Sequence, residues 1–253
     1  MDTLEKIRTY WDTHIHDLEI AKHPVGTLEF FRELSQYRFE KLDYLPKLVN
    51  FDGFSGKKLL EIGCGLGIDL IRFAKGGAEV TGIDLSSTAI RLAKTYFDLE
   101  NVRGHLEVMN GEALQFPDAL FDVVYCHGVL QYTAHPEQMI REAFRVLKPG
   151  GMFIGMVYNR KGWLYAFSKW FRVKLEHEDA PVFRVYTEKE WRQMLSCFSS
   201  VRIIPERFPV KSKLHQKGIK GFLFNTVFVA LFGLIPKPWV RSWGWHLMAF
   251  AIK

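Results

Sequence analysis

Cysteine is scarce in this sequence. The 253 residues include three cysteines, Cys64, Cys126 and Cys197, which are odd in number, far apart and not arranged as C-x-x-C. This spacing argues against a disulfide framework and a zinc site, and it is typical of a protein in a reducing cytoplasm. The histidines show no ligand spacing either, and we expect His14 and His16 to be solvated. The sequence therefore predicts no metal site.

Long apolar runs and targeting signals are also missing. The uncharged run Gly221 to Pro236 has 16 residues, fewer than the about 20 that span a bilayer as a helix. The start of the chain, Met1 to Glu5, is polar and acidic, so we expect no secretory signal. With 48% hydrophobic and 25% charged residues, the composition is ordinary for a globular protein. The 253 residues suffice for one α/β domain with a buried core, or for one domain with a cap.

Acidic residues are almost absent from the end of the chain. From Pro205 onward, eight Lys or Arg residues accompany Glu206 alone, so this tail holds the whole excess behind the net charge of +6. A basic tail can meet an anionic membrane, a nucleic acid or an acidic substrate, or it can be an ordinary solvated face.

The most informative segment runs from Leu59 to Asp69. Its apolar start breaks into three glycines at alternate positions, Gly63, Gly65 and Gly67, and an apolar-periodic segment follows. This pattern predicts a buried strand, a tight turn and the start of a helix. Glycine is required where the backbone takes positive φ or comes close to a ligand, so the turn is a candidate binding site.

A second predicted strand ends in an acid, Asp84, at the same edge of the sheet. An acid there suits the two hydroxyl groups of a ribose. The dinucleotide fingerprint G-x-G-x-x-G is not matched, because the third glycine comes one residue early. Asp69 would also repel a pyrophosphate at the helix start. The spacing therefore disfavours a pyridine-nucleotide oxidoreductase.

Strand and helix patterns alternate from Lys58 onward, which predicts a Rossmann-like, doubly wound and mostly parallel sheet. The predicted strands are 58–63, 79–84, 105–109, 121–126, 152–158, 200–207 and 244–252. The predicted helices are 68–75, 86–97, 136–148, 162–173 and 187–197, with start signals at Ser86 or Ser87, Pro136 and Thr187. Residues 3 to 49 read as further helices.

Four motifs in order resemble the class I S-adenosylmethionine-dependent methyltransferases. The resemblance is to the small-molecule group related to the ubiquinone/menaquinone methyltransferases. The motifs are Glu61–Gly67, Gly82–Ser86, Phe121–Val124 and Arg145–Gly151. The match covers about residues 55–160, whereas the N-terminal helices and the tail match loosely. It implies transfer of a methyl group from S-adenosyl-L-methionine to an O-, N- or C-nucleophile of a small molecule, which leaves S-adenosyl-L-homocysteine.

The resemblance also implies cofactor-binding residues at the carboxyl ends of the strands, where open α/β sheets bind ligands. These are Glu61, Gly63, Cys64, Gly65 and Gly67 at the methionine part, Asp84 at the ribose, Leu85 beside the adenine, Gly111, Glu112 and Ala113 at the adenine edge, and Cys126 and His127 at the methionine amino group.

His127 is the candidate catalytic base. Related sequences often have two histidines where this chain has Gln131 and Tyr132. A neutral imidazole at His127 can take a proton from a hydroxyl or amine nucleophile, or it can pack beside the cofactor. Methyl transfer can also need no base, since in-line positioning and exclusion of water act on an already activated donor.

Two alternatives to this enzyme remain open. One is a partner subunit that binds the cofactor without its own catalysis, and the other is a nucleic-acid methyltransferase. Cys126 to Val129 is not the Asn/Asp-Pro-Pro-Tyr type that grips exocyclic amines of bases, which disfavours nucleic acid. The basic tail keeps that alternative open.

We expect one domain, 1–253, with three parts. Residues 1–50 form either a helical layer or a lid, in which Tyr10, Tyr37 and Arg38 are candidate contacts, since aromatic faces attract a sulfonium cation. Residues 55–160 form the cofactor-binding core. Residues 161–253 form a substrate-side cap and the last strands, with an insertion at about 211–241. That insertion lies in a membrane interface, caps an apolar acceptor such as a quinone, or packs on the sheet edge or in a dimer. The expected location is cytoplasmic, with membrane contact confined to the inner face.

Overall fold

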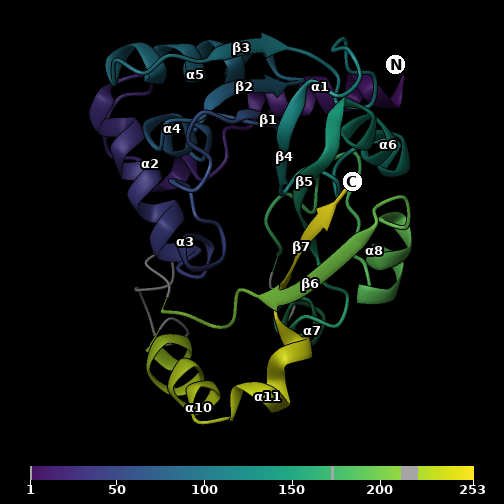
Figure 1. Cartoon of the computed structure of the whole chain (residues 1–253). Helices are drawn as coiled ribbons and strands as arrows, with labels where there is room; N and C mark the ends of the chain where they lie inside the picture. Colours follow the sequence, from purple (N-terminus) through teal and green to yellow (C-terminus); the bar gives the residue numbers. More distant parts are fainter. Residues whose placement is uncertain (1, 172–173, 212–221) are drawn as a thin grey trace.

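The computed structural model describes residues 2–171, 174–211 and 222–253. Its centre is a seven-stranded sheet with the order β3-β2-β1-β4-β5-β7-β6 (Figure 1). The strands are β1 (Lys58–Ile62), β2 (Glu79–Asp84), β3 (His105–Val108), β4 (Phe121–His127), β5 (Leu147–Tyr158), β6 (Ser200–Glu206) and β7 (His246–Ile252). The first five run parallel, whereas β7 is antiparallel to both β5 and β6. The predicted mostly parallel, Rossmann-like sheet is confirmed.

Helices connect these strands and precede them. They are α1 (Thr3–Thr13), η1 (Leu18–Ile20), α2 (Leu28–Lys41), α3 (Leu45–Leu48), α4 (Leu70–Lys75), α5 (Ser87–Leu99), α6 (Pro136–Val146), α7 (Trp163–Phe171), α8 (Glu188–Met194), η2 (Leu223–Phe228), α10 (Val229–Gly233), α11 (Lys237–Val240) and η3 (Arg241–Trp243). The expected start signals hold: Ser86 caps α5, Pro136 opens α6, and Thr187 forms a capping box with Glu190 before α8.

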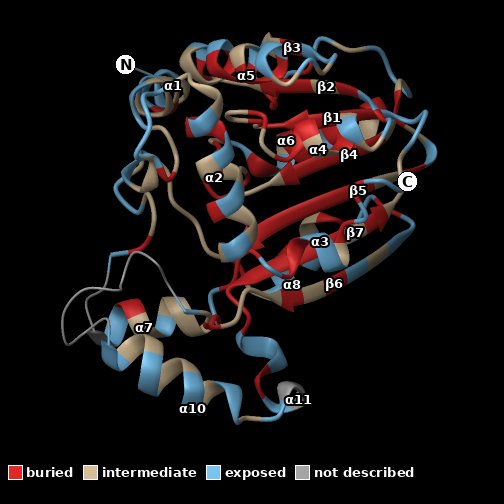
Figure 2. Ribbon diagram, turned by 90° about the vertical axis from the view of Figure 1, so that its left-hand side faces the viewer, coloured by how far each residue is buried: buried red, intermediate tan, exposed pale blue. Residues whose placement is uncertain are grey.

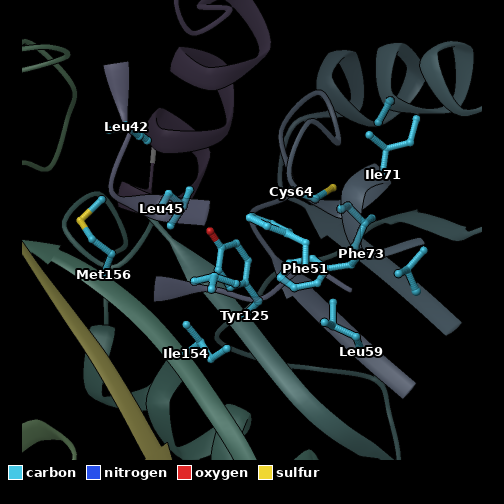
Figure 3. Packing of buried hydrophobic residues seen from close by; sticks show 14 of the residues in the cluster. Leu42, Leu45, Phe51, Leu59, Cys64, Ile71, Phe73, Tyr125, Ile154 and Met156 are labelled. Carbon is cyan, nitrogen blue, oxygen red and sulfur yellow. The ribbon is translucent and has the colours of Figure 1, made fainter. Parts of the chain in front are cut away.

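Helices α2, α4 and α5 cover one face of the sheet, and α6 and α8 cover the other (Figure 1). A hydrophobic core lies on each face of the sheet. Neighbouring residues of one strand pack into different cores, because side chains alternate along a strand. Leu59 of β1 packs in the first core and Leu60 in the second. Figure 3 shows the first core, where the rings of Phe51 and Tyr125 both contact Phe73.

The expected boundaries differ from the structure around Pro149. Helix α6 ends at Val146, and β5 begins at once with Leu147 opposite Phe121. The pairing then shifts register before Met152. Gly150 has a φ of 74°, which only glycine adopts readily. The proline and glycines therefore form an irregularity inside β5 rather than a break before it.

Helices α7, η2, α10 and α11 gather at one end of the molecule, beyond the sheet (Figures 1 and 2). We call residues 163–171 and 222–243 together the aromatic lobe. The strands above it are mostly buried, whereas α10 is mostly exposed or intermediate (Figure 2). Residues 212–221 of the expected insertion lie outside the described residues.

Candidate active site

A cavity of about 240 Å³ lies at the carboxyl ends of β1, β2 and β4. Its walls come from α1, α2, the turn after β1, the ends of β2 and β4, and residues from the loop before α8 and around β6 and β7. The expected location at the carboxyl edge of an open α/β sheet matches this arrangement. We call the part lined by Glu61, Gly63, Gly65, Asp84 and Gly111 the glycine-turn half.

The turn after β1 is shaped by glycine conformation. Gly63, Gly65 and Gly67 have φ values of 72°, 51° and 74°, a region that side chains disfavour. A Cβ at Gly63 would overlap Val129, whereas no described atom lies within 4 Å of a Cβ placed at Gly65. The backbone is thus packed against the chain at Gly63 and open to the cavity at Gly65.

Glu61 brings a buried carboxylate to this half. The residue is 4% exposed, and its Oε2 has no hydrogen-bond partner among the described residues. Burial and the nearby Asp69 charge raise the pKa of Glu61 well above its usual value. A buried, unpartnered carboxylate costs free energy unless a cation or hydrogen-bond donor meets it. The position therefore suits a positively charged group of a ligand.

Asp84 lies at the tip of β2 with both oxygens fixed. Oδ2 accepts a hydrogen bond from the Gly65 N–H and Oδ1 accepts one from the Ser86 N–H, each at 2.9 Å. Burial raises the pKa of Asp84 despite these bonds. Each carboxylate oxygen can accept a further hydrogen bond, so Asp84 can still bind hydroxyl groups from the cavity.

Helix α1 is attached to the start of α5 by Asp12. Its Oδ1 accepts hydrogen bonds from the Ser86 Oγ at 2.9 Å, the Ser87 Oγ at 3.2 Å and the Thr88 N–H at 3.1 Å. Leu4 and Ile7 of the same helix line the cavity. Asp12 thus holds α1 across the cavity edge next to Asp84.

The structure places eight of the twelve expected cofactor residues in the cavity wall. They are Glu61, Gly63, Cys64, Gly65, Asp84, Leu85, Gly111 and His127. The other four lie outside the lining: a Cβ at Gly67 would meet the Phe97 ring, Glu112 binds the Thr133 hydroxyl and the His135 N–H, Ala113 is exposed, and Cys126 is buried in the second core. Of the three candidate lid contacts, Arg38 lines the cavity and Tyr10 and Tyr37 do not.

Asp69 has a role that its position in the sequence did not reveal. Its side chain is 1% exposed and receives two hydrogen bonds from Arg38, at 2.6 and 2.5 Å, and one from the Tyr125 hydroxyl at 2.8 Å. Burial favours the neutral acid, but Arg38 outweighs it and holds the pKa of Asp69 below its usual value. The negative charge is therefore neutralised within the protein.

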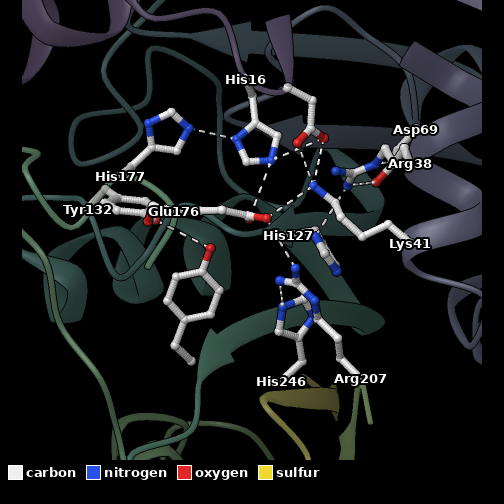
Figure 4. A network of polar contacts seen from close by, with 12 residues as sticks. His16, Arg38, Lys41, Asp69, His127, Tyr132, Glu176, His177, Arg207 and His246 are labelled. Carbon is white, nitrogen blue, oxygen red and sulfur yellow. Dashed lines mark hydrogen bonds and ion pairs between the residues drawn. The ribbon is translucent and has the colours of Figure 1, made fainter. Parts of the chain in front are cut away.

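Charged side chains line the rest of the cavity, which we call the charged half (Figure 4). Lys41 Nζ contacts both carboxylate oxygens of Asp17, at 2.6 and 2.7 Å, and lies 3.4 Å from Glu176 Oε1. Arg207 Nη2 donates to the same Glu176 oxygen at 3.2 Å. Burial opposes ionisation of Glu176, yet these two cations hold its pKa well below the usual value. Glu176 is therefore an anion shared by two cations.

His127 lies in a chain of contacts that fixes its protons. Arg38 Nη2 lies 3.3 Å from His127 Nδ1, and a guanidinium can only donate, so Nδ1 accepts. The proton of the neutral ring is then on Nε2, which donates to the Tyr44 hydroxyl at 3.2 Å. Arg207 fixes His246 in the same way, and His246 Nδ1 lies 2.6 Å from that hydroxyl.

These contacts bear on the expected base. Burial, followed by the Arg38 charge, lowers the pKa of His127 to about 3. Its accepting nitrogen is engaged by Arg38, and its other nitrogen carries the proton. The catalytic role of His127 stays a prediction, and this geometry does not favour it.

His16 is partly exposed, with 38% of its side chain accessible. His14 is exposed, and both His14 and His16 line the cavity, where His16 Nδ1 contacts His177 Nε2 at 2.8 Å. The Tyr10 hydroxyl lies 3.0 Å from His177 Nδ1 and 3.2 Å from Asp179 Oδ1. His16 Nε2 lies 3.5 Å from Asp17 Oδ2 and 3.9 Å from Glu176 Oε2. Burial lowers the pKa of His16 to about 4, so the ring is neutral.

Sequence reasoning missed most of the charged half. Asp17, Lys41, Glu176, Arg207 and His246 come from five distant segments, and no local motif joins them. One signal was present in α2. Arg38 and Lys41 follow the buried Leu34 at helical spacing, so two charged residues continue the apolar face of the helix. Charges on a buried stripe point to paired or functional groups.

The expected cap over the cavity is not formed by the described part of the insertion. Residues 222–243 do not appear in the cavity wall, whereas Arg207 and His246 on either side of that segment do. None of the helices within residues 2–171, 174–211 and 222–253 combines the length and the apolar character of a membrane-spanning helix.

Comparisons with known proteins agree with this geometry. A family model described as "Methyltransferase domain" matches residues 60–155. A ubiquinone biosynthesis O-methyltransferase of Pseudomonas fluorescens is 36% identical over 162 residues, which are 62% of this chain and 69% of that protein. One of Alkalilimnicola ehrlichii is 29% identical over 61% of this chain and 65% of its own length. This chain thus spans slightly less than two thirds of that second relative.

The fold is also found among solved structures. An S-adenosylmethionine-dependent methyltransferase from Thermotoga maritima superposes with a TM-score of 0.62 over 98% of this chain and 99% of its own, at 15% identity. At this identity the likeness concerns the fold, including the helices before β1.

Proposed function

This chain belongs to the class I S-adenosylmethionine-dependent methyltransferases, and from that membership we propose that it transfers a methyl group to a small-molecule acceptor. The observation that carries the proposal is the glycine-turn half of the cavity. It combines an open glycine backbone at Gly65, a buried unpartnered oxygen of Glu61 and a fixed carboxylate at Asp84. These three features suit the methionine part and the ribose of S-adenosyl-L-methionine.

The residues present fit this cofactor. Glu61 would meet the ammonium group of the methionine part, which would satisfy Oε2 and keep the carboxylate ionised. Gly63, Cys64 and Gly65 would lie under the methionine chain, and Asp84 would accept hydrogen bonds from the ribose. Leu85 and Gly111 line the wall where the adenine would lie. When bound, the cofactor supplies an activated methyl group.

The acceptor is proposed to occupy the charged half. Lys41, Glu176 and Arg207 line that part of the cavity, together with His16 and Tyr158. Buried charges are arranged in pairs there, so an apolar group alone would gain little by entering. We therefore propose an acceptor whose reacting end carries a hydroxyl or amine and hydrogen-bonds to these groups. The printed activity of the curated relatives, O-methylation in ubiquinone biosynthesis, favours a hydroxyl.

His16 is the better placed base in this proposal. In the tautomer with the proton on Nδ1, its Nε2 has a lone pair for the acceptor, and Asp17 Oδ2 and Glu176 Oε2 lie at 3.5 and 3.9 Å from it. A proton taken from the acceptor would form an imidazolium beside two carboxylates, which would stabilise it. His127, held between Arg38 and Tyr44, would act instead by fixing the wall of the cavity.

The proposal also includes a cytoplasmic location and a choice against the two alternative functions, a partner subunit and a nucleic-acid methyltransferase. Three scattered cysteines support a reducing cytoplasm. A cofactor-binding partner without catalysis would keep the glycine-turn half but would need no ordered charged half. A nucleic-acid substrate would need cations facing outward around the cavity, whereas Lys41 and Arg207 are 9% and 11% exposed and paired. These features favour a small-molecule enzyme.

The first experiment is calorimetric titration of S-adenosyl-L-methionine and S-adenosyl-L-homocysteine into the purified protein. We expect micromolar binding of both, and Asp84→Asn should weaken it by about 1.5–3 kcal/mol through lost charge-assisted hydrogen bonds. Glu107→Asn, at an exposed carboxylate of β3, is the matched control and should bind as the unaltered protein does. Unchanged affinity in Asp84→Asn would remove Asp84 from its assigned role.

Release of S-adenosyl-L-homocysteine separates the enzyme from the partner subunit. A mixed cell extract, with and without nuclease treatment, serves as the source of acceptors. Cofactor binding without product release under any of these conditions would favour the partner subunit. Nuclease-sensitive release would favour a nucleic acid.

A further inference from the structure

The aromatic lobe exposes more large apolar side chains than a monomeric soluble surface normally carries in one place. Phe222 is 61% exposed, Leu231 59% and Leu234 79%. Three exposed tryptophans accompany them, Trp170 at 84%, Trp239 at 78% and Trp243 at 46%. All of them come from α7, α10 and their neighbours at the end of the molecule that projects beyond the sheet (Figures 1 and 2).

The helix formed by η2 and α10 is apolar on two faces. Its inner face packs on α7, where Phe228 contacts Trp163 and Phe167. Its outer face carries Leu223, Val227, Leu231 and Leu234 at helical spacing, and all four are exposed. The inner face explains how the helix is held to the protein. The outer face has no covering among the described residues.

Charge complementarity indicates what covers the outer face. The two segments that carry the lobe, 161–175 and 208–245, contain ten Lys or Arg residues and no Asp or Glu. This exceeds the net charge of +6 for the whole chain, so the remainder is net negative. In the described part, Lys169, Lys174, Lys211 and Arg241 are exposed. An occupant must therefore offer both an apolar interior and negative charge.

We propose that the aromatic lobe docks on the surface of an anionic lipid bilayer. Leucine and phenylalanine side chains enter the acyl boundary, tryptophans lie at the headgroup level, and the basic side chains face anionic headgroups. The helix is too short to cross, which fits an orientation in the plane of the membrane. A second copy of the chain is a poorer occupant, because two lobes with the same positive charge would repel each other.

The docked lobe would place the cavity near the membrane. Arg207 follows β6 and His246 begins β7, so the segment between them leaves and re-enters the sheet beside the charged half. An acceptor with a polar end and an apolar tail would reach this cavity from the bilayer. The docking itself does not depend on the methyltransferase activity.

Vesicle flotation tests the proposal without any acceptor or cofactor. We expect the protein to float with vesicles of phosphatidylcholine and phosphatidylglycerol in equal parts at low salt. Binding should weaken as salt is added, because salt screens the headgroup charge. Leu231→Ser combined with Leu234→Ser should lower the partition coefficient about tenfold or more, since two exposed leucines would no longer enter the acyl region.

Matched variants test the face and the charge separately. Leu99→Ser combined with Val108→Ser removes two apolar side chains that are 42% and 45% exposed elsewhere, and this control should leave flotation unchanged. Lys174→Glu combined with Arg241→Glu should reduce binding to the anionic vesicles by about fivefold for each charge removed. Arg91→Glu combined with Lys94→Glu on α5 is the control for charge and should reduce binding much less.

Three results would overturn the proposal. One is the absence of flotation with the anionic vesicles at low salt. Another is flotation that the serine variants leave unchanged. The third is a dimer in solution that the serine variants convert to a monomer while vesicles bind neither form, since the lobe would then be a contact between copies. Urea unfolding midpoints of all variants, expected to match that of the unaltered protein, verify folding.

Discussion

The two halves of the cavity differ in which part of the chain lines them: mainly backbone in one half and side chains in the other. The glycine-turn half consists largely of backbone that follows β1 and β2, and its two carboxylates, Glu61 and Asp84, sit at or next to strand ends. The charged half consists of side chains from segments far apart in the chain, and each ion depends on the next. Backbone turns retain their shape when neighbouring side chains change. A network of paired ions does not, because removing one partner leaves the other unpaired and buried.

The comparison predicts that stability depends most on Arg38, which lines the cavity and contacts both Asp69 and His127. Arg38→Met would leave Asp69, with 1% of its side chain exposed, without its cation. We expect the free energy of unfolding to fall by about 3–5 kcal/mol, the range for breaking a buried ion pair. Urea denaturation measures it.

Arg32→Met on the same helix is the control for Arg38. Arg32 pairs with Glu100, but its own side chain is 63% exposed, so the expected loss is below about 1 kcal/mol. Arg38→Met combined with Asp69→Leu should recover most of the loss, because no buried charge remains unpaired. Equal losses in Arg38→Met and Arg32→Met would contradict the role of burial.

The same difference between the two halves explains which parts of the site could be predicted from the sequence. The sequence could predict the mostly parallel sheet, the glycine turn, Glu61 and Asp84, because each is indicated by a local pattern in or next to a strand. The charged half was not, because Lys41, Glu176 and Arg207 meet only when three distant segments fold together. Asp69 illustrates the difference: its position suggested repulsion of a ligand, whereas Arg38 from α2 neutralises it.

Catalysis should depend on the charged half, and His16→Gln tests this. With an acceptor identified from the extract, we expect kcat to fall about hundredfold, within the usual range for loss of a general base. Cofactor affinity should not change, since His16 lies outside the glycine-turn half. Because the pKa of His16 is about 4, the kcat of the unaltered protein should stay level down to about pH 5 and fall below it.

His23→Gln is the control for His16, because His23 is exposed and contacts Glu33 at the surface. It should retain full activity. If His127→Gln were to lose more activity than His16→Gln, the base would be His127, and its neutral, engaged state in the structure would not be the reactive one.

His127 should instead affect how stability depends on pH. Its folded-state pKa of about 3 lies below its usual value of 6.5, so below pH 6.5 the unfolded chain binds a proton that the folded protein does not. Lowering the pH through this window therefore lowers the free energy of unfolding, by up to about 1.4 kcal/mol per pH unit for this group. His127→Gln lacks the group, so its stability should decline less steeply between about pH 6.5 and 5.

The control for His127 is His105→Gln, at a side chain that is 61% exposed. This variant should keep the pH dependence of the unaltered protein. A His127→Gln curve parallel to that of the unaltered protein would mean that the histidine is not held neutral by its surroundings. The pKa of His127 would then no longer be evidence that buried charges distinguish the two halves.

The smallest expected effect concerns the contact that closes the glycine-turn half. Asp12→Ala removes the acceptor for the Thr88 N–H and for the hydroxyls of Ser86 and Ser87. We expect a loss of about 0.5–2 kcal/mol, as for a helix cap, and faster release of bound S-adenosyl-L-homocysteine as α1 separates from α5. Stopped-flow dissociation and hydrogen exchange of α1 measure both.

Asp2→Ala supplies the control, because Asp2 caps α1 itself at the Thr3 N–H. It should loosen the first turn of α1 without releasing the helix from α5. If Asp2→Ala and Asp12→Ala were to accelerate release equally, the stability of α1 would control access. If only Asp12→Ala does so, access depends on the attachment of α1 to α5, and the N-terminal helices act as the lid that their position over Asp84 suggests.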